Sequence, residues 1–363
     1  MTPRIAFMGA GAIGSYLGAF LSREGYEPTL IDPWPEHVEA MKANGLTVLG
    51  SQGPFTVPVK ALHLTEVQNV AEPFDIAFIA MKSYDTEWAT MFIKRYLAPT
   101  GFVVCSQNGI NDETVARIAG YERTVGLIMS AIAVGLEGPA QVYRGGAVGR
   151  DRGHDVFRVG EFNGMVTPRA TMLAQMLECI DGSHVTTNLW GERWSKLATN
   201  CMGNTLAAMS GLATGDLARL APRFSVLRDQ VVKELVQVGQ ALGVNIEPIG
   251  GKPAAAWLEA EMTDAPPSGN GSGAPSPERP AGTNWATSTL QDVIKGRKTE
   301  VDYLNGYVSQ RGREVGIATP VNDAIVTILK QVDAGTRPAS PANVDAVWDL
   351  VQGQAQASSI DAV

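Results

Sequence analysis

A glycine-rich turn near the start of the chain is the first pattern in this sequence that could do chemistry. In RIAFMGAGAIGSYLGAFL the spacing is G-x-G-x-x-G, and the turn comprises Gly9, Ala10, Gly11, Ala12, Ile13 and Gly14. The first glycine permits a tight turn, the second lets backbone N–H groups approach a pyrophosphate, and the third lets the helix pack closely on the strand. We therefore predict a dinucleotide site here; the alternative is a purely structural turn.

Asp32 ends the second apolar run, PTLID, and decides which dinucleotide we expect. A carboxylate about twenty residues past the glycines accepts hydrogen bonds from the adenosine ribose and repels the 2′-phosphate of NADP. NAD is therefore the predicted cofactor. NADP stays open because Arg4 and Arg23 could serve as phosphate partners. In the alternative interpretation, Asp32 only starts the turn before Pro33.

Two polar residues follow the next apolar runs. Lys82 lies in FIAMKSYDT and Asn108 lies in VVCSQNGIN. Ligands of doubly wound sheets bind outside the carboxyl ends of the strands, so both residues are candidates for the cofactor site. Taken singly, Lys82 is typical of a surface lysine and Asn108 of a turn.

Lys196, Asn200 and Asn204 recur at i, i+4 and i+8 in NLWGERWSKLATNCMGNTLAAMSG. Each step drifts by only about 40° around a helix of 3.6 residues per turn, so the three share one face. Burying them without partners is costly. We expect this face, called the polar row below, to line a polar cleft; a solvent face is the alternative.

Ser288 lies twelve residues before Glu300 in STLQDVIKGRKTEVDYLNGYV. The apolar residues Val301, Leu304 and Val308 predict a helix whose first turn contains Glu300. Taken alone, Glu300 is a carboxylate favoured by the helix dipole.

Short apolar runs alternate with amphipathic stretches in the first half of the chain. Buried strands are expected at residues 4–9, 28–32, 74–82 and 101–107. Helices are expected at residues 13–23, 35–43, 86–97 and 111–119. This pattern indicates an α/β fold with an N-terminal Rossmann doubly wound sheet. Residues 124–134 and 155–162 are interpreted as antiparallel additions.

After Asn188 the pattern becomes helical. Helices are expected at residues 189–211, 217–242, 284–295 and 301–315. We predict a Rossmann dinucleotide-binding domain at 1–185 and a mostly helical substrate and dimerisation domain at 186–335, followed by a tail at 336–363 with one short helix at 341–353. The Pro/Gly/Ser-rich stretch 265–282 is predicted to be a long loop.

Composition narrows the class of ligand. The 363 residues carry a net charge of −8, which argues against nucleic-acid and anionic-membrane surfaces. Three widely spaced cysteines suggest neither a disulfide framework nor a metal site. No apolar run is long enough to span a bilayer and no leader pattern is present, so the cytoplasm is expected.

Together these residues resemble the ketopantoate reductase family. The resemblance runs from about residue 4 to about residue 330 and also includes the late motif Gly316-Ile-Ala-Thr-Pro-Val-Asn322. It implies a Rossmann domain joined to a helical domain, with an active site in the cleft between them that interconverts a 2-oxo acid and a 2-hydroxy acid. A homodimer is compatible with it.

The resemblance also assigns roles. Lys196 would be the general acid that protonates the carbonyl oxygen, and Glu300 would hydrogen-bond the substrate hydroxyl and position Lys196. The carboxylate end would be bound by Asn200, Asn204 and Ser288. Asn108 would lie between nicotinamide and substrate, and Lys82 would approach the cofactor.

Three departures from the family pattern limit how far the family's residue roles apply to this chain, and the first two weaken ketopantoate as the substrate. Asp32-Pro33 stands where the NADPH-dependent members carry a basic residue, and Thr214 stands where a further asparagine is expected. The region from Gly250 to Gly282 is also longer than expected, and its loop is either a lid or a wall of the substrate pocket, or an inert surface insertion.

The predicted function is therefore an NAD-preferring 2-hydroxy acid dehydrogenase. The nearest alternative is an NADPH-dependent 2-dehydropantoate 2-reductase of coenzyme A biosynthesis. A β-hydroxy acid dehydrogenase and a catalytically silent dinucleotide-binding protein are further alternatives.

Overall fold

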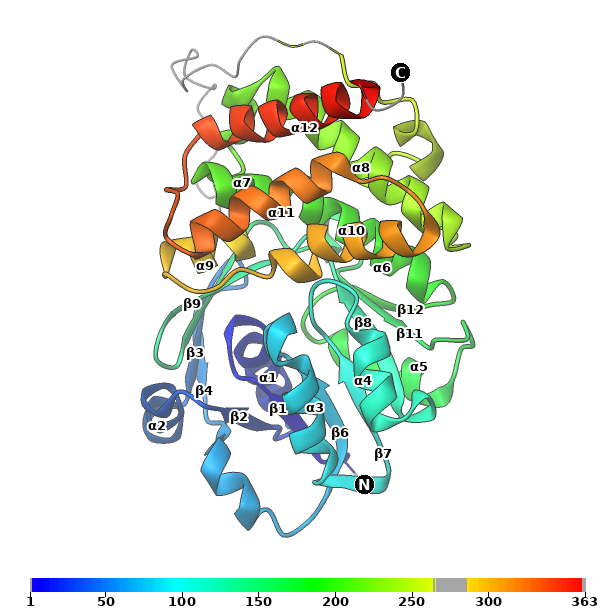
Figure 1. The fold of residues 1–363 in the computed structure, drawn as a ribbon. Coiled ribbons are helices and arrows are strands. Elements are labelled where there is room, and N and C mark those ends of the chain that lie inside the picture. The colour runs from blue at the N-terminus through cyan, green and yellow to red at the C-terminus, as the bar shows by residue number, and fades with distance from the viewer. Residues whose placement is uncertain (1, 264, 266–285, 361–363) are drawn as a thin grey trace. The chain divides into compact units, whose positions relative to one another are not determined.

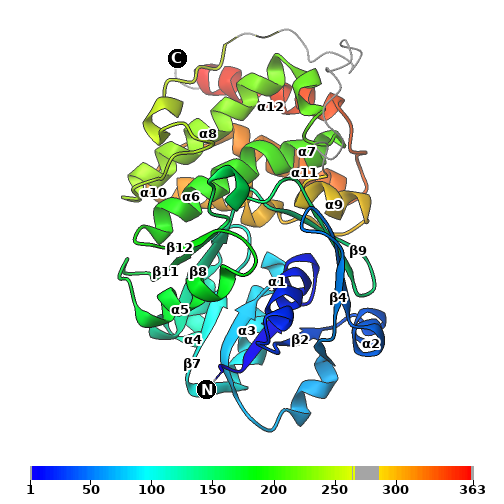
Figure 2. The ribbon, with the colours of Figure 1, turned by 180° about the vertical axis from the view of Figure 1, so that it is seen from behind.

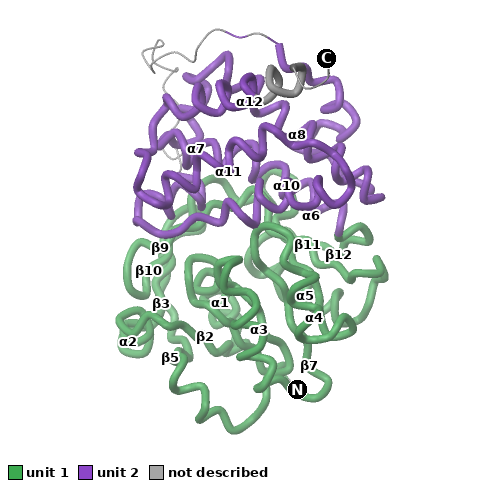
Figure 3. Tube along the Cα trace, in the orientation of Figure 1, with its two compact units in different colours: residues 1–189 green, residues 190–363 purple. Residues whose placement is uncertain are grey.

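The computed structural model describes residues 2–263, 265 and 286–360, which divide into two compact units, residues 1–189 and 190–363 (Figure 3). Apart from Ala265, the loop predicted at 265–282 lies outside the described residues. Each unit is presented by itself below.

An eight-stranded sheet forms the centre of unit 1 (Figure 1). In spatial order its strands are β12 (Ser183–Thr186), β11 (Phe157–Gly160), β8 (Thr124–Met129), β7 (Leu97–Cys105), β6 (Phe74–Ile79), β1 (Ile5–Met8), β2 (Thr29–Asp32) and β5 (Lys60–His63). From β5 to β8 every neighbouring pair is parallel. Counted along the chain, these strands follow the order 3-2-1-4-5-6 of a Rossmann fold, which confirms the predicted class.

Helices cover both faces of this sheet. The helices α1 (Ala12–Arg23) and α5 (Pro168–Leu177) share one apolar core, which is seen from their side in Figure 2. The helices α3 (Thr86–Lys94) and α4 (Asp112–Ala119) share the core of the other face. Helix α1 lies very close to the sheet, because a Cβ on Gly18 would come within 2.4 Å of the Leu30 side chain. This close approach packs α1 against β2.

A second sheet in unit 1 is absent from the sequence prediction. In spatial order its strands are β4 (Phe55–Val57), β3 (Leu46–Gly50), β10 (Gln141–Gly145) and β9 (Ala133–Gly138). The parallel pair β3 and β10 joins segments that are far apart in the sequence. Most residues of β4 and β9 are only partly buried, so these strands lack a clear hydrophobic pattern.

A buried ion pair ties the second sheet to the first. The Arg144 guanidinium on β10 pairs with Asp181, which lies just before β12, and both side chains are almost fully buried. Arg144 also donates a hydrogen bond of 2.7 Å to the Tyr16 hydroxyl on α1. The Arg144 charge and the surrounding N–H donors hold the pKa of Asp181 below its usual range, although burial acts in the opposite direction. Removing one partner would leave an uncompensated buried charge.

The interpretation of residues 124–134 and 155–162 as antiparallel additions was only partly right. Strand β8 is parallel to β7 and extends the Rossmann sheet, whereas β11 is antiparallel to β8. The residues after Met129 leave this sheet, and β9 begins at Ala133 in the second sheet. The stretch 124–134, predicted as one strand, therefore contains a change from one sheet to the other.

Helices dominate the described part of unit 2. They are α6 (Leu189–Thr199), which begins at the unit boundary, α7 (Thr205–Ser210), α8 (Arg223–Ala241), α9 (Ser288–Ile294), α10 (Asn305–Val315), α11 (Pro320–Asp333) and α12 (Ala342–Ile360). The prediction of a mostly helical C-terminal part is confirmed. None of the described helices is both long and apolar enough to cross a membrane.

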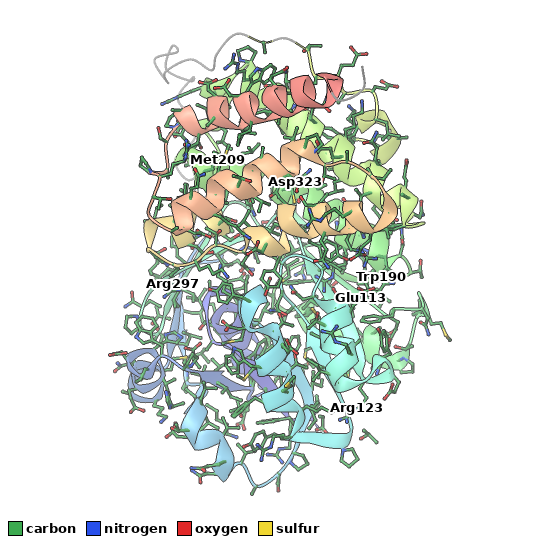
Figure 4. The ribbon with its side chains drawn as sticks, in the orientation of Figure 1. Glu113, Arg123, Trp190, Met209, Arg297 and Asp323 are labelled. Atoms are coloured by element: carbon green, nitrogen blue, oxygen red, sulfur yellow. The ribbon has the colours of Figure 1, made fainter. Side chains whose placement is uncertain are left out.

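Helix α12 is longer than the predicted helix at 341–353 and packs within unit 2. Val344, Val347 and Trp348 are buried, and the Arg223 guanidinium lies 5.0 Å from the centre of the Trp348 ring. Asn343 donates a 2.8 Å hydrogen bond to the carbonyl of Met209, which is labelled in Figure 4. Residues we assigned to a tail therefore contribute to the core of this unit.

Candidate active site

The glycine turn has the geometry that a dinucleotide requires. Gly9 has φ +103°, and a Cβ on it would come within 2.9 Å of the Ala80 backbone. A Cβ on Gly14 would lie 1.9 Å from the Gly9 carbonyl oxygen, so a side chain cannot be accommodated there. By contrast, a Cβ on Gly11 would meet nothing within 4 Å. The free space at Gly11 fits the close approach of a pyrophosphate to the backbone.

The N-terminus of α1 follows this turn directly and suits an anion. No side chain caps the helix, and its first turn contains no acidic residue. Because the first N–H groups of a helix have no partner within it, they and the helix dipole favour phosphate oxygens.

Asp32 accepts two backbone hydrogen bonds, one from the glycine turn and one from the turn that follows Asp32. Its Oδ2 accepts from the Ala10 N–H at 2.8 Å, and its Oδ1 accepts from the Trp34 N–H at 2.9 Å. The Trp34 bond is the turn-starting role considered as the alternative for Asp32, and the Ala10 bond fixes the glycine turn. Each carboxylate oxygen retains a second lone pair that a ribose hydroxyl could use.

Lys82 and Asn108 lie on loops that follow the parallel neighbours β6 and β7, so both leave the sheet at the same edge. The two loops are bonded to each other. Asn111 Nδ2 donates to the Asn108 carbonyl at 2.8 Å and to Ser83 Oγ at 3.1 Å. The structure thus brings the two predicted residues onto adjoining, cross-linked loops.

Gln107 completes this cross-link and was missed in the sequence. Its Nε2 donates to the Met81 carbonyl at 2.9 Å and to Thr86 Oγ1 at 2.8 Å, and its side chain is buried. The available signal was a polar side chain placed between an apolar strand and the Asn108 turn, which needs partners when it is buried.

In unit 2 the polar row is not part of one continuous α-helix, contrary to the prediction for 189–211. Residues Asn200–Asn204 form a π-helical turn between α6 and α7. A π-helix advances by fewer degrees per residue than an α-helix, so it reduces the drift expected between Asn200 and Asn204. Asn204 Nδ2 donates to Asn200 Oδ1 at 3.1 Å, which places both amides on one side of the helix.

Asn200 is buried, and its Nδ2 has no hydrogen-bond partner among the described residues. Asn204 Nδ2 also lies 3.5 Å from Ser288 Oγ, and Thr287 Oγ1 donates to the Asn204 carbonyl at 3.3 Å. The structure therefore brings Asn200, Asn204 and Ser288 together from distant parts of the sequence. An unsatisfied buried N–H beside two further polar groups fits an acceptor such as a carboxylate oxygen.

Lys196 is half-buried on α6, one turn before Asn200. Glu300 is buried, with only 6% of its surface exposed. It does not lie in the first turn of an α-helix, as predicted, but just before the short 3-10 turn Val301–Tyr303, and α10 begins only at Asn305. The neighbouring Thr299 fixes the segment through a 2.8 Å hydrogen bond to Asp333 on α11.

A buried carboxylate on α8, Glu234, was also missed. It caps the N-terminus of α11 by accepting from the N–H groups of Val321 at 2.9 Å and Asn322 at 3.0 Å. Burial raises the pKa of Glu234 to about 7. Asn322 in turn accepts a 2.8 Å hydrogen bond from Asn305 at the start of α10. Glu234 thereby helps to fix the helix that follows the Glu300 segment; the late motif contained Asn322 but gave no sign of this partner.

Family models match most of this chain. The family model described as ketopantoate reductase PanE/ApbA matches residues 5–154, and the model of its C-terminal part matches residues 188–333. A 2-dehydropantoate 2-reductase of Archaeoglobus fulgidus is 27% identical over 340 residues, covering 92% of this chain and 98% of the relative.

Solved structures with the same fold include two informative cases. A PanE/ApbA family ketopantoate reductase from Ralstonia eutropha has 26% identity and a TM-score of 0.73, covering 92% of this chain and 99% of its own. D-mandelate dehydrogenase with NADH and anilino(oxo)acetate has 23% identity and a TM-score of 0.75, covering 92% and 98%. The family models together span most of the chain, so it belongs to the ketopantoate reductase family of NAD(P)-dependent oxidoreductases.

Proposed function

We propose that this enzyme is an NAD-preferring dehydrogenase that transfers hydride between the nicotinamide and carbon 2 of a 2-hydroxy or 2-oxo acid. The main support for an acid substrate is the buried Asn200 amide, whose Nδ2 has no partner among the described residues. Asn204 and Ser288 lie beside it. A substrate carboxylate would supply the missing acceptor and would be bound by these three side chains.

Unit 1 would bind the cofactor. The backbone of residues Gly9–Gly14 would hold the pyrophosphate, and Asp32 would accept hydrogen bonds from the adenosine ribose and disfavour a 2′-phosphate. Lys82 and Asn108 would approach the nicotinamide end. Support comes from the open space at Gly11 and from the shared edge of the loops after β6 and β7.

Lys196 would act as the general acid in reduction. When bound, NAD(P)H supplies the hydride for the carbonyl carbon. Lys196 Nζ gives its proton to the carbonyl oxygen as negative charge develops there, and in oxidation the neutral amine takes the hydroxyl proton back. Glu300 would accept a hydrogen bond from the substrate hydroxyl and orient Lys196. Its burial limits its motion and keeps its carboxylate away from bulk water.

The second candidate is an NADPH-dependent 2-dehydropantoate 2-reductase, the activity for which the Archaeoglobus fulgidus relative is named. Against it stand Asp32-Pro33 after the second strand and Thr214 in place of an asparagine. Cofactor preference and substrate separate the two candidates.

The test is a spectrophotometric panel of 2-oxo acids, ketopantoate included, with NADH and NADPH, and of 2- and 3-hydroxy acids with NAD and NADP. We expect turnover of a 2-oxo or 2-hydroxy acid other than ketopantoate with a preference for NAD(H). Efficient ketopantoate reduction with a strong NADPH preference would favour the second candidate instead.

We also propose that the enzyme works as a homodimer in the cytoplasm. The described cysteines are all free thiols, as expected in a reducing compartment. Light scattering of the purified chain would measure the mass of the assembly, and a monomer mass at micromolar concentration would contradict the dimer.

A further inference from the structure

The Ala10 peptide groups in the glycine turn are held from several sides. The Ala10 N–H donates to Asp32 Oδ2 at 2.8 Å. The Ala10 carbonyl oxygen accepts from Ser15 Oγ at 2.6 Å and contacts His37 Nε2 at 2.8 Å. From the sequence, only Asp32 was considered for the cofactor site, and no role was predicted for Ser15 or His37.

His37 is fully buried on α2 (Pro35–Asn44), and its hydrogen bonds define its tautomer. Its Nδ1 accepts from the Ala140 N–H at 2.9 Å, so this nitrogen carries no proton. The proton therefore lies on Nε2, which donates to the Ala10 carbonyl. Ala140 joins β9 to β10, so His37 connects the glycine turn to the second sheet of unit 1.

The direction of the Ala10 carbonyl fixes the direction of the next N–H group. In a planar trans peptide the C=O of one residue and the N–H of the following residue point in opposite directions. With its carbonyl held toward Ser15 and His37, Ala10 aims the Gly11 N–H away from them. Gly11 is also the turn residue at which a Cβ would meet nothing within 4 Å.

We propose that Ser15 and His37 form a clamp on the Ala10 carbonyl and act as positioning residues for the dinucleotide by aiming the Gly11 N–H at the pyrophosphate. This proposal rests on the proposed function in that it assumes a dinucleotide on the glycine turn. Neither side chain of the Ala10 clamp touches the reacting atoms. The clamp acts through the backbone by orienting the Gly11 N–H before the ligand binds. Binding to such an N–H is stronger than binding to one that the ligand must first order, because less reorganisation is needed.

The test compares three variants of the full chain with the wild type. His37→Leu removes both ring nitrogens, whereas His37→Gln keeps an N–H that can donate to the Ala10 carbonyl. His184→Gln is the matched control. His184 lies on β12, at the end of the sheet opposite β5, and it is partly exposed. It pairs with Asp155 at 2.7 Å. Calorimetry gives the Kd for NAD, and steady-state kinetics gives kcat and KM for the acid.

We expect His37→Leu to raise the Kd for NAD by about 3-fold to 10-fold, less than the loss of a whole hydrogen bond to a charged group, because the Gly11 N–H and Ser15 remain. At saturating cofactor its kcat should stay within about twofold, because binding of ground and transition states is weakened equally. His37→Gln should restore most of the affinity, and His184→Gln should bind NAD as the wild type does. A general packing defect would instead lower kcat as well and would not be rescued by Gln.

A folded His37→Leu enzyme with the wild-type Kd for NAD would overturn the proposal. If His37→Leu does not fold, Ser15→Ala decides, since it removes the other donor to the same carbonyl with little change in volume. It should raise the Kd severalfold, and an unchanged Kd would overturn the clamp. A wild-type chain that binds neither NAD nor NADP would overturn both the proposed function and the clamp. If instead all variants turn over substrate and bind NAD with the wild-type Kd, the clamp alone would be overturned.

Discussion

The glycine turn of unit 1 and the polar row of unit 2 use their hydrogen-bonding groups in different ways. Around Ala10 the N–H and the carbonyl are both paired, by Asp32 on one side and by Ser15 and His37 on the other. In the polar row, Asn200 is equally buried, yet its Nδ2 has no partner among the described residues. The Ala10 peptide groups are satisfied without a ligand. Asn200 has a buried donor that no described residue satisfies.

This difference suggests a division of labour. A turn fixed by internal bonds presents its backbone to a common cofactor with little reorganisation. A buried donor without an acceptor costs stability in the free protein and gains a strong hydrogen bond when an anionic substrate binds. The π-helical turn at Asn200–Asn204 belongs to the same pattern, because such turns are less stable than α-helix and occur often at functional sites.

The largest expected effect comes from Lys196. Lys196→Ala should lower turnover by about 100-fold or more, the range for the loss of a positioned general acid, because no other group then protonates the carbonyl oxygen. Steady-state kinetics with saturating cofactor measures the loss. Calorimetry should show an unchanged Kd for NAD, and a variant with normal turnover would remove Lys196 from the mechanism.

The next largest effect is expected at the unsatisfied donor. Asn200→Leu should raise the KM for the acid by roughly 10-fold to 100-fold, the range for a hydrogen bond to a charged group. It should leave the free energy of unfolding nearly unchanged, because removing the unsatisfied Nδ2 offsets the loss of the acceptor that Asn200 Oδ1 gives to Asn204.

Asn322→Leu is the matched control for Asn200→Leu. Its amide is also buried, but it donates to Glu234 at 2.7 Å and accepts from Asn305 at 2.8 Å. It should lower the free energy of unfolding by about 1 to 3 kcal/mol, since it leaves Glu234 short of one donor and Asn305 short of its acceptor. Equal losses of stability in the two variants would show that the contrast between the satisfied Nδ2 of Asn322 and the unsatisfied Nδ2 of Asn200 is wrong.

A smaller change is expected for cofactor choice. Asp32→Ala should shift the ratio of kcat/KM for NAD and NADP toward NADP by about tenfold, since a single charge interaction near a protein surface is on the order of 1 to 4 kcal/mol. The same variant should also lose stability, because the Ala10 and Trp34 N–H groups lose their acceptor. An unchanged ratio together with a lower melting temperature would show that Asp32 serves only the turn.

The smallest effect concerns pH. Burial lowers the pKa of His37, against the opposing influence of Asp32 and of the bond to Ala10. Below about pH 6.5 the unfolded chain therefore takes up a proton at His37, while the folded chain does not. As the pH is lowered in this range, the free energy of unfolding decreases by at most about 1.4 kcal/mol per pH unit. The stability that comes from keeping His37 neutral is fully present above about pH 6.5. It is lost as the pH falls toward the pKa of His37 in the folded protein.

Urea unfolding between pH 5 and 8 measures this dependence. His37→Gln has no proton to gain and should show a shallower slope. His154, whose pKa burial also lowers, contributes equally to both proteins and cancels in the difference. Identical slopes in the two proteins would contradict the neutral, internally bonded state of His37.

The sequence predicted those parts of the molecule whose information is local. The glycine turn, β1 and α1 occupy a continuous stretch in which each glycine has its own steric duty, and the parallel order of β6 and β7 followed from buried apolar runs. The second sheet was missed because β3 pairs with the distant β10 and its outer strands are only partly buried. The periodicity of a segment does not show which distant segment it pairs with.

The polar row shows the same limit at the level of the site. Its spacing predicted one helical face, but nothing in NCMGN indicates a π-helical turn, which depends on packing against distant helices. The partners of Ala10 and Asn322, namely His37 and Glu234, were also hidden, because a single buried His or Glu resembles any other polar residue in sequence.

The central claim is direct hydride transfer between the nicotinamide and carbon 2 of the acid, and deuterium transfer tests it most directly. The enzyme is incubated with NADH carrying deuterium at carbon 4 of the nicotinamide, in each stereochemical form, and with the best 2-oxo acid of the panel; the product is then analysed by mass spectrometry. The account predicts deuterium at carbon 2 of the hydroxy acid from one form, at a rate that depends on Lys196. Failure to transfer deuterium from either form to any 2-oxo acid would contradict it.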